Sequence, residues 1–191
     1  MRQEKFLDKK TVLNAGCGFI NLLENPYAED KFKGWNVTRM DINEETKPDI
    51  LSDICDMESV KDNTFDAIWS QHTLEHLFTA DVDKALNEFF RVMKPGGFVA
   101  MYLPDFKKIA EIVIEEPDIE KVQYVSTGGC IRTVDMVFGY EQAIQSGQDK
   151  MLHKTCFTEF SITKKLEKAG FVNVNFLFDR WDFFVTAYKI G

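Results

Sequence analysis

Several features that would assign this chain to a special class are missing from its sequence. It has a net charge of −8 and no block of five or six like charges, so the basic face that binds a phosphate backbone is not expected. The four cysteines are widely spaced without a Cys-x-x-Cys pair, which disfavours a disulfide framework or a structural zinc site. No apolar run reaches the ~18–20 residues that span a bilayer, and no signal-type apolar segment follows the first residues. We therefore expect a soluble, cytoplasmic protein with reduced thiols and with neither a nucleic-acid nor a membrane partner.

The composition favours one folded unit. The chain has 191 residues, of which 45% are apolar and 17 are phenylalanine, which is enough material for a single core. We find no internal repeat, linker or low-complexity segment. Residues 1–191 are therefore predicted to form a single domain.

Short apolar runs alternate with helical patterns along the chain. A helix is expected around 82–93, where Lys94-Pro95-Gly96-Gly97 ends it with a turn. The last two strands are separated by a short turn, so they should form an antiparallel hairpin. The expected strands cover residues 11–15, 35–40, 48–52, 65–70, 98–103, 171–178 and 182–189. This order predicts an α/β fold, a three-layer, doubly wound, mostly parallel seven-stranded sheet with an antiparallel C-terminal hairpin.

Capping signals define the helices in the second half. Asp105 is expected to cap a helix over 106–116, with Phe106, Ile109, Ile112 and Val113 facing inward. Thr158 is expected to cap the last helix, which Gly170 ends. The region between them has no clean period, and it follows the fifth strand. We interpret residues 105–154 as an insertion that forms a lid or substrate region.

Polar or glycine residues follow the strands of the first half. Gly16-Cys17-Gly18 follows the first strand, Asp41 the second and Asp53 the third. The carboxyl ends of parallel strands share one edge of the sheet, where such folds bind ligands. A glycine loop permits close approach of a ligand, and an acid after the second strand can accept hydrogen bonds from ribose hydroxyls. The third glycine of the dinucleotide fingerprint is missing, which counts against a nicotinamide cofactor.

The fourth strand leads into a histidine-rich segment. His72-x-x-Glu75-His76 has the spelling of the inverted zinc-protease motif, in which two histidines ligate zinc. That motif needs a long helix and a further acidic ligand, whereas this one begins at a strand end. We therefore predict no metal site, and a structural role for His76.

Taken in order, these motifs resemble the class I S-adenosylmethionine-dependent methyltransferases, in the branch of small single-domain enzymes. Val12 to Gly18 is similar to the family's first motif, and residues 65–70 with Leu74-Glu75-His76-Leu77 resemble its fourth-strand motif. Residues 90–98 and 166–171 also fit. The resemblance covers roughly 11–104 and 156–189.

The resemblance implies a cofactor, S-adenosylmethionine, which leaves as S-adenosylhomocysteine, and a set of site residues. His72 and His153 are the candidate general bases. His72 directly follows the fourth strand, and His153 lies where the insertion returns to the sheet. The implied cofactor-binding residues are Asn14, Ala15, Gly16, Gly18, Asp41, Ile42, Asp53, Ile54, Ser70 and Gln71.

The expected function is methyl transfer to a small-molecule acceptor, such as a sugar or glycan-precursor hydroxyl. Two alternatives remain open: a subunit that binds the cofactor but has lost catalysis, and an NAD-dependent oxidoreductase. The family usually has an acid where this chain has Asn14 and often glycine where it has Ile20, which affects the expected cofactor affinity. The acceptor atom and the oligomeric state are not specified by the sequence.

Overall fold

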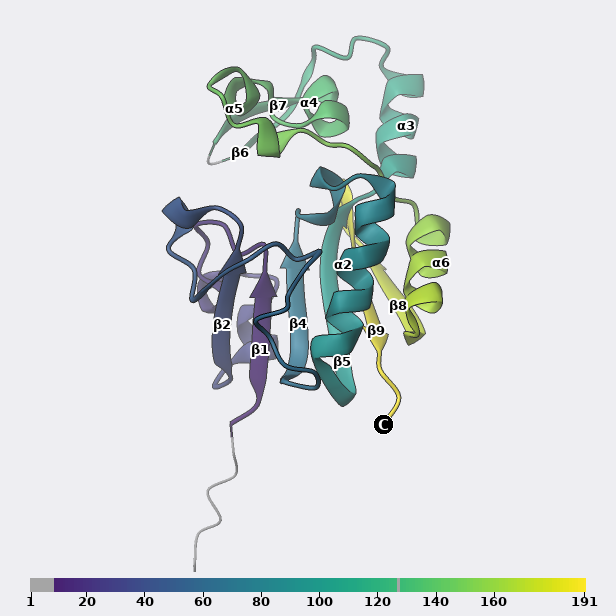
Figure 1. Cartoon of the computed structure of the whole chain (residues 1–191). Helices are drawn as coiled ribbons and strands as arrows, with labels where there is room; N and C mark the ends of the chain where they lie inside the picture. Colours follow the sequence, from purple (N-terminus) through teal and green to yellow (C-terminus); the bar gives the residue numbers. More distant parts are fainter. Residues whose placement is uncertain (1–8, 127) are drawn as a thin grey trace, which may run out of the picture.

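The computed structural model describes residues 9–126 and 128–191, and its centre is a seven-stranded sheet (Figure 1). The strand order is β3-β2-β1-β4-β5-β9-β8, in which β9 runs antiparallel to both β5 and β8. The first five strands pair in parallel. The strands are β1 (Thr11–Ala15), β2 (Asn36–Asp41), β3 (Ile50–Leu51), β4 (Phe65–Gln71), β5 (Met93–Pro104), β8 (Val172–Phe178) and β9 (Asp182–Tyr188). The sheet predicted from the sequence is confirmed.

Two cores lie on opposite faces of the sheet. The larger one packs α2 (Thr79–Val92) and α6 (Glu159–Ala169) against sheet residues such as Leu13 and Ile68. Figure 1 shows α2 in front of the sheet. The smaller one packs α1 (Glu29–Phe32) against Trp69 and its neighbours. The helical layer on this face is therefore much smaller than the one on the other face. The described segment between β1 and β2 holds a short 3-10 turn (Leu22–Glu24) and one short helix.

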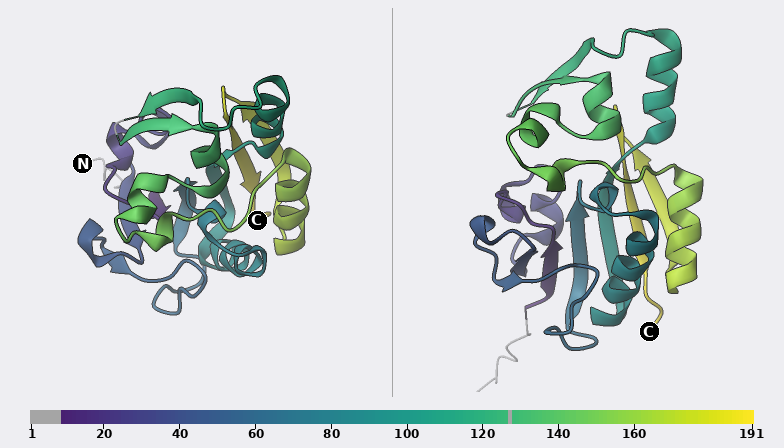
Figure 2. Two further views of the ribbon diagram at one scale, coloured as in Figure 1. Left: turned by 90° about the horizontal axis from the view of Figure 1, so that it is seen from above. Right: turned by 45° about the horizontal axis from the view of Figure 1, so that its top comes forward.

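The insertion lies beyond the carboxyl ends of the parallel strands (Figures 1 and 2). Its elements are α3 (Phe106–Glu115), β6 (Val122–Ser126), β7 (Gly129–Arg132), α4 (Thr133–Phe138), α5 (Glu141–Gln145) and a 3-10 turn (Asp149–Met151). Arg132 bonds to Asp135, Glu120 and Glu141 and so holds these elements together. The insertion begins and ends at adjacent points, because the Phe106 amide donates to the Phe157 carbonyl over 2.9 Å.

The helix caps agree with the sequence. Thr158 Oγ1 accepts from the Ser161 amide over 3.2 Å, and Gly170 ends α6 in the left-handed conformation. Asp105 Oδ1 accepts from the Lys107 amide over 3.0 Å at the start of α3. Phe157 and Ile162 are both buried, as expected of a hydrophobic contact across an N-cap.

Three local predictions need correction. Residues 94–97, predicted as a turn, are part of β5 but bulge out of its ladder, because Phe65 pairs with Met93 and Ala67 with Phe98 and Gly96 has a positive φ of 79°. The third strand is shorter than predicted. In α3, Ile109 is buried, whereas Phe106 and Val113 are exposed, because this helix belongs to the insertion and presents part of its apolar face to solvent.

Within residues 9–126 and 128–191, no helix is long and apolar enough to cross a bilayer.

Candidate functional site

The glycine loop after β1 folds against the end of β2. The amides of Gly16 and Cys17 both donate to the Met40 carbonyl over 2.9 Å. The Gly18 amide donates to Asp41 Oδ2 over 2.8 Å, and the Asn43 amide donates to Asp41 Oδ1 over 2.9 Å. A carboxylate has about four acceptor positions, so Asp41 can accept further hydrogen bonds from a ligand. The structure thus brings Gly16, Gly18 and Asp41 together, as the sequence predicts.

Arg39 fixes this loop, a role that was not predicted from the sequence. Its guanidinium donates to the carbonyl oxygens of Gly18 (2.8 Å), Thr46 (2.9 Å) and Lys47 (3.0 Å). Arg39 therefore joins the glycine loop to the β2–β3 connection. An arginine inside a strand carries no local signal for this role, because its partners come from two separate loops.

Asn14 and Ala15 are buried at the end of β1. Asn14 pairs with Arg39 of β2 and with Trp69 of β4 in the strand register. Among hydrogen bonds between described residues, none involves the Asn14 side chain. This amide is thus placed next to the glycine loop without a fixed partner in that part of the chain.

Three further residues predicted to bind the cofactor, Ile42, Asp53 and Ile54, follow β2 and β3. Ile42 follows Asp41 and is 52% exposed, so an apolar surface is available beside the carboxylate. Ile54 is buried, and Asp53 Oδ1 accepts from the Cys55 amide over 2.8 Å. Asp53 and Ile54 follow the shortened β3 and form a separate wall of the same edge.

Ser70 and Gln71 end β4. Ser70 is fully buried, and its Oγ has no hydrogen-bond partner among the described residues. The Gln71 side chain accepts from Asn25 Nδ2 over 2.5 Å. Asn25 belongs to the short segment after the glycine loop, and Tyr27 of that segment stacks on Tyr102 of β5 with ring centroids 4.6 Å apart. This segment, through Asn25 and Tyr27, therefore packs against the carboxyl-terminal ends of β4 and β5.

His72 lies at the tip of β4 in a constrained conformation. Its backbone has φ of 47°, in the left-handed region that costs about 1–3 kcal/mol for most residues, and its amide donates to the Tyr102 carbonyl over 3.0 Å. Its Nδ1 lies 3.2 Å from Glu75 Oε1, while 42% of its side chain remains exposed. Burial opposes the charged form, but the hydrogen bond to Glu75 and the charge of that carboxylate raise the pKa of His72.

Glu75 is the buried centre of the histidine cluster. It is 2% exposed, and its hydrogen bond to His72 and the nearby histidines lower its pKa although burial acts in the opposite direction. His76 Nδ1 lies 3.1 Å from the Leu152 carbonyl, and His153 Nδ1 lies 3.2 Å from the Met136 carbonyl. The two rings have centroids 5.1 Å apart. Burial lowers the pKa of His153. The structure therefore brings His72 and His153 to the same cluster, with Glu75 between them.

Asp182 and Asp179 complete the edge above β5 and β9. Burial, with contributions from Glu75 and Asp179, raises the pKa of Asp182, although the nearby His72 acts in the opposite direction. The Tyr102 hydroxyl donates to Asp179. These acids were not recognised in the sequence, because they lie in the C-terminal hairpin, far along the chain from β4.

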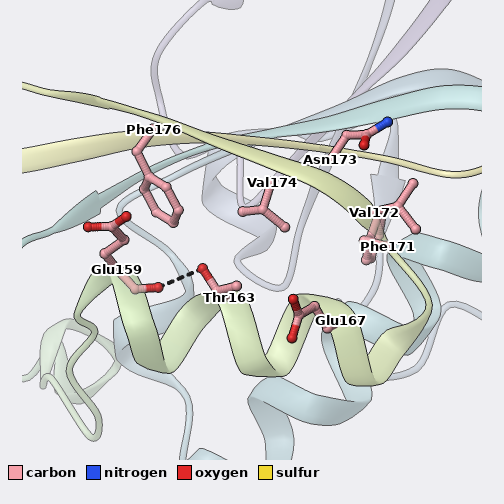
Figure 3. Close-up of a pocket in the computed structure, with 8 residues that line it drawn as sticks. All are labelled: Glu159, Thr163, Glu167, Phe171, Val172, Asn173, Val174 and Phe176. Carbon is pink, nitrogen blue, oxygen red and sulfur yellow. Dashed lines mark hydrogen bonds between the residues drawn. The ribbon is translucent and has the colours of Figure 1, made fainter.

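A separate groove lies between α6 and the first half of β8 (Figure 3). Its lining mixes acidic and apolar side chains, and the Thr163 hydroxyl donates to the Glu159 carbonyl inside it over 2.8 Å. The lining residues are Glu159, Thr163, Glu167, Phe171, Val172, Asn173, Val174 and Phe176. None of them belongs to the strand ends described above, so this groove is distinct from the candidate site.

Comparison with known proteins agrees with this geometry. Residues 13–101 match the family described as "Methyltransferase domain". A SAM-dependent methyltransferase from Archaeoglobus fulgidus has the same fold, with 18% identity, a TM-score of 0.62, and coverage of 95% of this chain and 87% of that one. The matched part of the chain, residues 13–101, therefore resembles a methyltransferase domain, and the whole chain shares the fold of such an enzyme. The family match includes the glycine loop, Asp41, His72 and Glu75, and it ends before the insertion.

Other structures share this fold at low identity. A possible exported protein from Bordetella parapertussis is 17% identical with a TM-score of 0.60, and the match covers 95% of this chain and 62% of that one. The chain thus spans less than two thirds of that protein's length. A 1,6-didemethyltoxoflavin-N1-methyltransferase from Burkholderia thailandensis, with its substrate and S-adenosylhomocysteine bound, is 15% identical with a TM-score of 0.56, and the match covers 96% of this chain and 72% of that one.

Proposed function

We propose that this protein transfers a methyl group from S-adenosylmethionine to a hydroxyl of a small molecule, of the sugar or glycan-precursor class. The observation that carries the proposal is that the glycine loop with Asp41 and the His72–Glu75 pair meet at the same edge of the sheet. The hydroxyl class is supported by the histidine, since oxygen nucleophiles of high pKa gain from a general base.

The residues at the edge fit the proposed cofactor. Added atoms at Gly18 would meet nothing within 4 Å, so a ligand can approach the loop backbone. We assign Asn14, Ala15, Gly16 and Gly18 to the methionine portion, Asp41 to the ribose hydroxyls, and Ile42, Asp53 and Ile54 to the adenine. Ser70 and Gln71 form the floor next to the reacting atoms. When bound, the cofactor supplies an electrophilic methyl group on a sulfonium.

His72 is the better placed of the two candidate bases. A carboxylate accepts hydrogen bonds, so Glu75 orients the Nδ1 proton of His72, and the Nε2 lone pair can then take the proton of the acceptor hydroxyl. The anionic Glu75 stabilises the imidazolium that results. His153 is assigned a secondary role, because its Nδ1 faces a carbonyl and its ring packs on His76.

The insertion is proposed to cover the acceptor as a lid. It lies beyond the strand ends in Figure 1 and in the right-hand view of Figure 2. Burial raises the pKa of its Tyr124, and the nearby Asp182 carboxylate raises it further. Sequestration by a lid excludes water and fixes the alignment of nucleophile, methyl and sulfur, from which much of the rate of such a displacement can come.

One observation favours a second candidate, a subunit that binds the cofactor without catalysis. Asn14 replaces a family acid beside the glycine loop, and this removes a charge that would face the ammonium group of the cofactor. Such a subunit would still bind S-adenosylhomocysteine.

Calorimetric titration with S-adenosylhomocysteine and with NAD tests the cofactor. We expect heat with the first ligand and none with NAD, and the reverse result would indicate an oxidoreductase. Release of S-adenosylhomocysteine is then measured with a panel of sugar nucleotides and, for comparison, a panel of primary amines. Turnover with hydroxyl acceptors supports the proposal, turnover with amines alone contradicts the acceptor class, and binding without any turnover favours the inactive subunit.

A further inference from the structure

We propose that Glu75, His76 and His153 form a binding site for a divalent transition-metal ion of the zinc class. One potential ligand atom from each of the three lies within 4.8 Å of the others. Two imidazoles and one carboxylate are a common protein ligand set for zinc and leave a coordination position open. No metal site was predicted from the sequence, where the motif His72-x-x-Glu75-His76 lacks the long helix and the further acidic ligand, and His153 was not considered as a ligand. This proposal goes beyond methyl transfer and does not depend on it.

The hydrogen bonds of both histidines leave the correct nitrogen available. A carbonyl oxygen only accepts, so the Nδ1 atoms of His76 and His153, which face the carbonyls of Leu152 and Met136, carry the protons. In a neutral imidazole the lone pair is then on Nε2. An Nδ1–H bonded to a backbone carbonyl is the arrangement that orients metal-binding histidines in proteins.

Glu75 provides an independent observation that points to a cation. Its Oε1 faces His72, whereas its Oε2 is buried and has no hydrogen-bond partner within the described part of the chain. A buried carboxylate oxygen without a partner is costly, by ~1–3 kcal/mol or more for a charged group. A cation beside Oε2 would remove that cost.

The backbone already holds the two segments together. The amides of Lys154 and Thr155 donate to the Glu75 carbonyl over 2.8 and 3.2 Å. The His76 side chain reaches the Leu152 carbonyl on the same returning segment. A tetrahedral ion with bonds of about 2.0–2.2 Å holds its ligand atoms roughly 3.3–3.6 Å apart. Side-chain rotations would therefore have to bring the three ligand atoms, now within 4.8 Å of one another, closer together. The ion would clamp the end of the insertion to the edge of the sheet.

This site differs from the zinc-protease motif suggested by the sequence. In that motif His72 and His76 would be the ligands, with Glu75 as the base. In the structure, Nδ1 of His72 faces the opposite oxygen of Glu75, and His153 is the second histidine. The two ligand sets therefore predict different losses of metal binding when His72 or His153 is substituted.

The full chain, treated with a chelator and dialysed, is titrated with Zn²⁺ by calorimetry and with Co²⁺ by visible absorption, which reports the coordination geometry. We expect one ion per chain and a Co²⁺ spectrum of low-symmetry tetrahedral or five-coordinate type. His153→Ala and Glu75→Gln should weaken binding at least 100-fold, whereas His72→Gln should retain it. Cys156→Ser is the control for a thiol site and should also bind normally.

Circular dichroism shows which variants are folded. If Glu75→Gln does not fold, His153→Ala is the variant that decides the test. Absence of stoichiometric binding would overturn the proposal. So would binding that survives His153→Ala, or binding that is lost in His72→Gln but kept in His153→Ala. Loss of binding in Cys156→Ser alone would assign the ion to a thiol site instead.

Discussion

The Gly18 amide and the Asp41 carboxylate are joined by a 2.8 Å hydrogen bond, which connects the loop after β1 to the end of β2. The same carboxylate is the proposed partner of the ribose hydroxyls, so it both shapes the loop and contacts the ligand. Asp41→Ala should therefore weaken S-adenosylhomocysteine binding by ~1–3 kcal/mol, about 5- to 150-fold. Calorimetry measures this, with Asp30→Ala, an exposed acid of α1, as the control. Unchanged affinity would remove Asp41 from the site.

The two loop glycines should differ in their tolerance of alanine. A Cβ at Gly16 would lie 2.3 Å from Thr73 Cγ2, whereas one at Gly18 would meet nothing within 4 Å. Both have positive φ, of 70° and 52°, which costs an alanine roughly 1–2 kcal/mol. Gly18→Ala should lose about that much in the free energy of unfolding, and Gly16→Ala about 1–3 kcal/mol more.

Urea unfolding tests this pair, and Thr73→Ala provides the rescue. Removing Thr73 Cγ2 and Oγ1 from the Gly16→Ala background should recover part of the additional loss. Equal losses for the two alanine variants would show that the backbone conformation, and not the contact with Thr73, requires glycine at residue 16.

His72→Gln should lower turnover by about 100- to 10,000-fold once an acceptor is known, because no general base then takes the proton of the acceptor hydroxyl. Cofactor affinity should change little, since His72 lies on the acceptor side. Kinetics with a hydroxyl acceptor and calorimetry with S-adenosylhomocysteine separate the two effects. Full turnover in His72→Gln with loss in His153→Ala would exchange the proposed roles of the two histidines.

Asp182 makes stability depend on pH. Burial, Glu75 and Asp179 raise the pKa of this carboxyl to about 6 from 3.8, despite the opposite effect of His72. The folded state therefore binds the Asp182 proton more tightly than the unfolded state does. The protonated carboxyl makes its full contribution to stability below about pH 4, and this contribution is lost as the pH rises to about 6. Above pH 7 the ionised group destabilises the fold by an estimated ~1–3 kcal/mol.

Asp182→Asn should remove this penalty. Urea unfolding should show a variant more stable than the wild type at pH 7.5, with the difference shrinking at pH 4.5. The Asp182 side chain has no hydrogen bond among those between described residues, so the amide breaks no such contact. A difference that is constant with pH would mean that Asp182 does not titrate in this range.

The sheet could be predicted because its signals are local. Apolar runs, the Thr158 cap and the Gly170 terminus are each specified by a few neighbouring residues, and the structure confirms them. The wrong prediction for α3 has the same origin: periodicity indicates an apolar face but not what covers it, and Phe106 and Val113 are exposed.

The candidate site could be predicted in part. The glycine loop and Asp41 meet because successive parallel strands end at one edge, which strand order alone implies. The hydrogen bond of Arg39 to Gly18 and the proximity of Glu75 to both His153 and Asp182 each join segments that are distant in the sequence. No spacing rule in the sequence reports them, because they depend on how the insertion and the hairpin return to the sheet.

The insertion leaves and rejoins the sheet at paired residues, since Asp105 and Phe157 form a parallel bridge. Because the two ends of the insertion are held side by side, the entropic cost of closing it changes little with its length. The segment could therefore be lengthened or shortened with little change to the strand ends below it. If the insertion covers the acceptor, as proposed above, a change of acceptor requires a change in this one segment and leaves the sheet as it is.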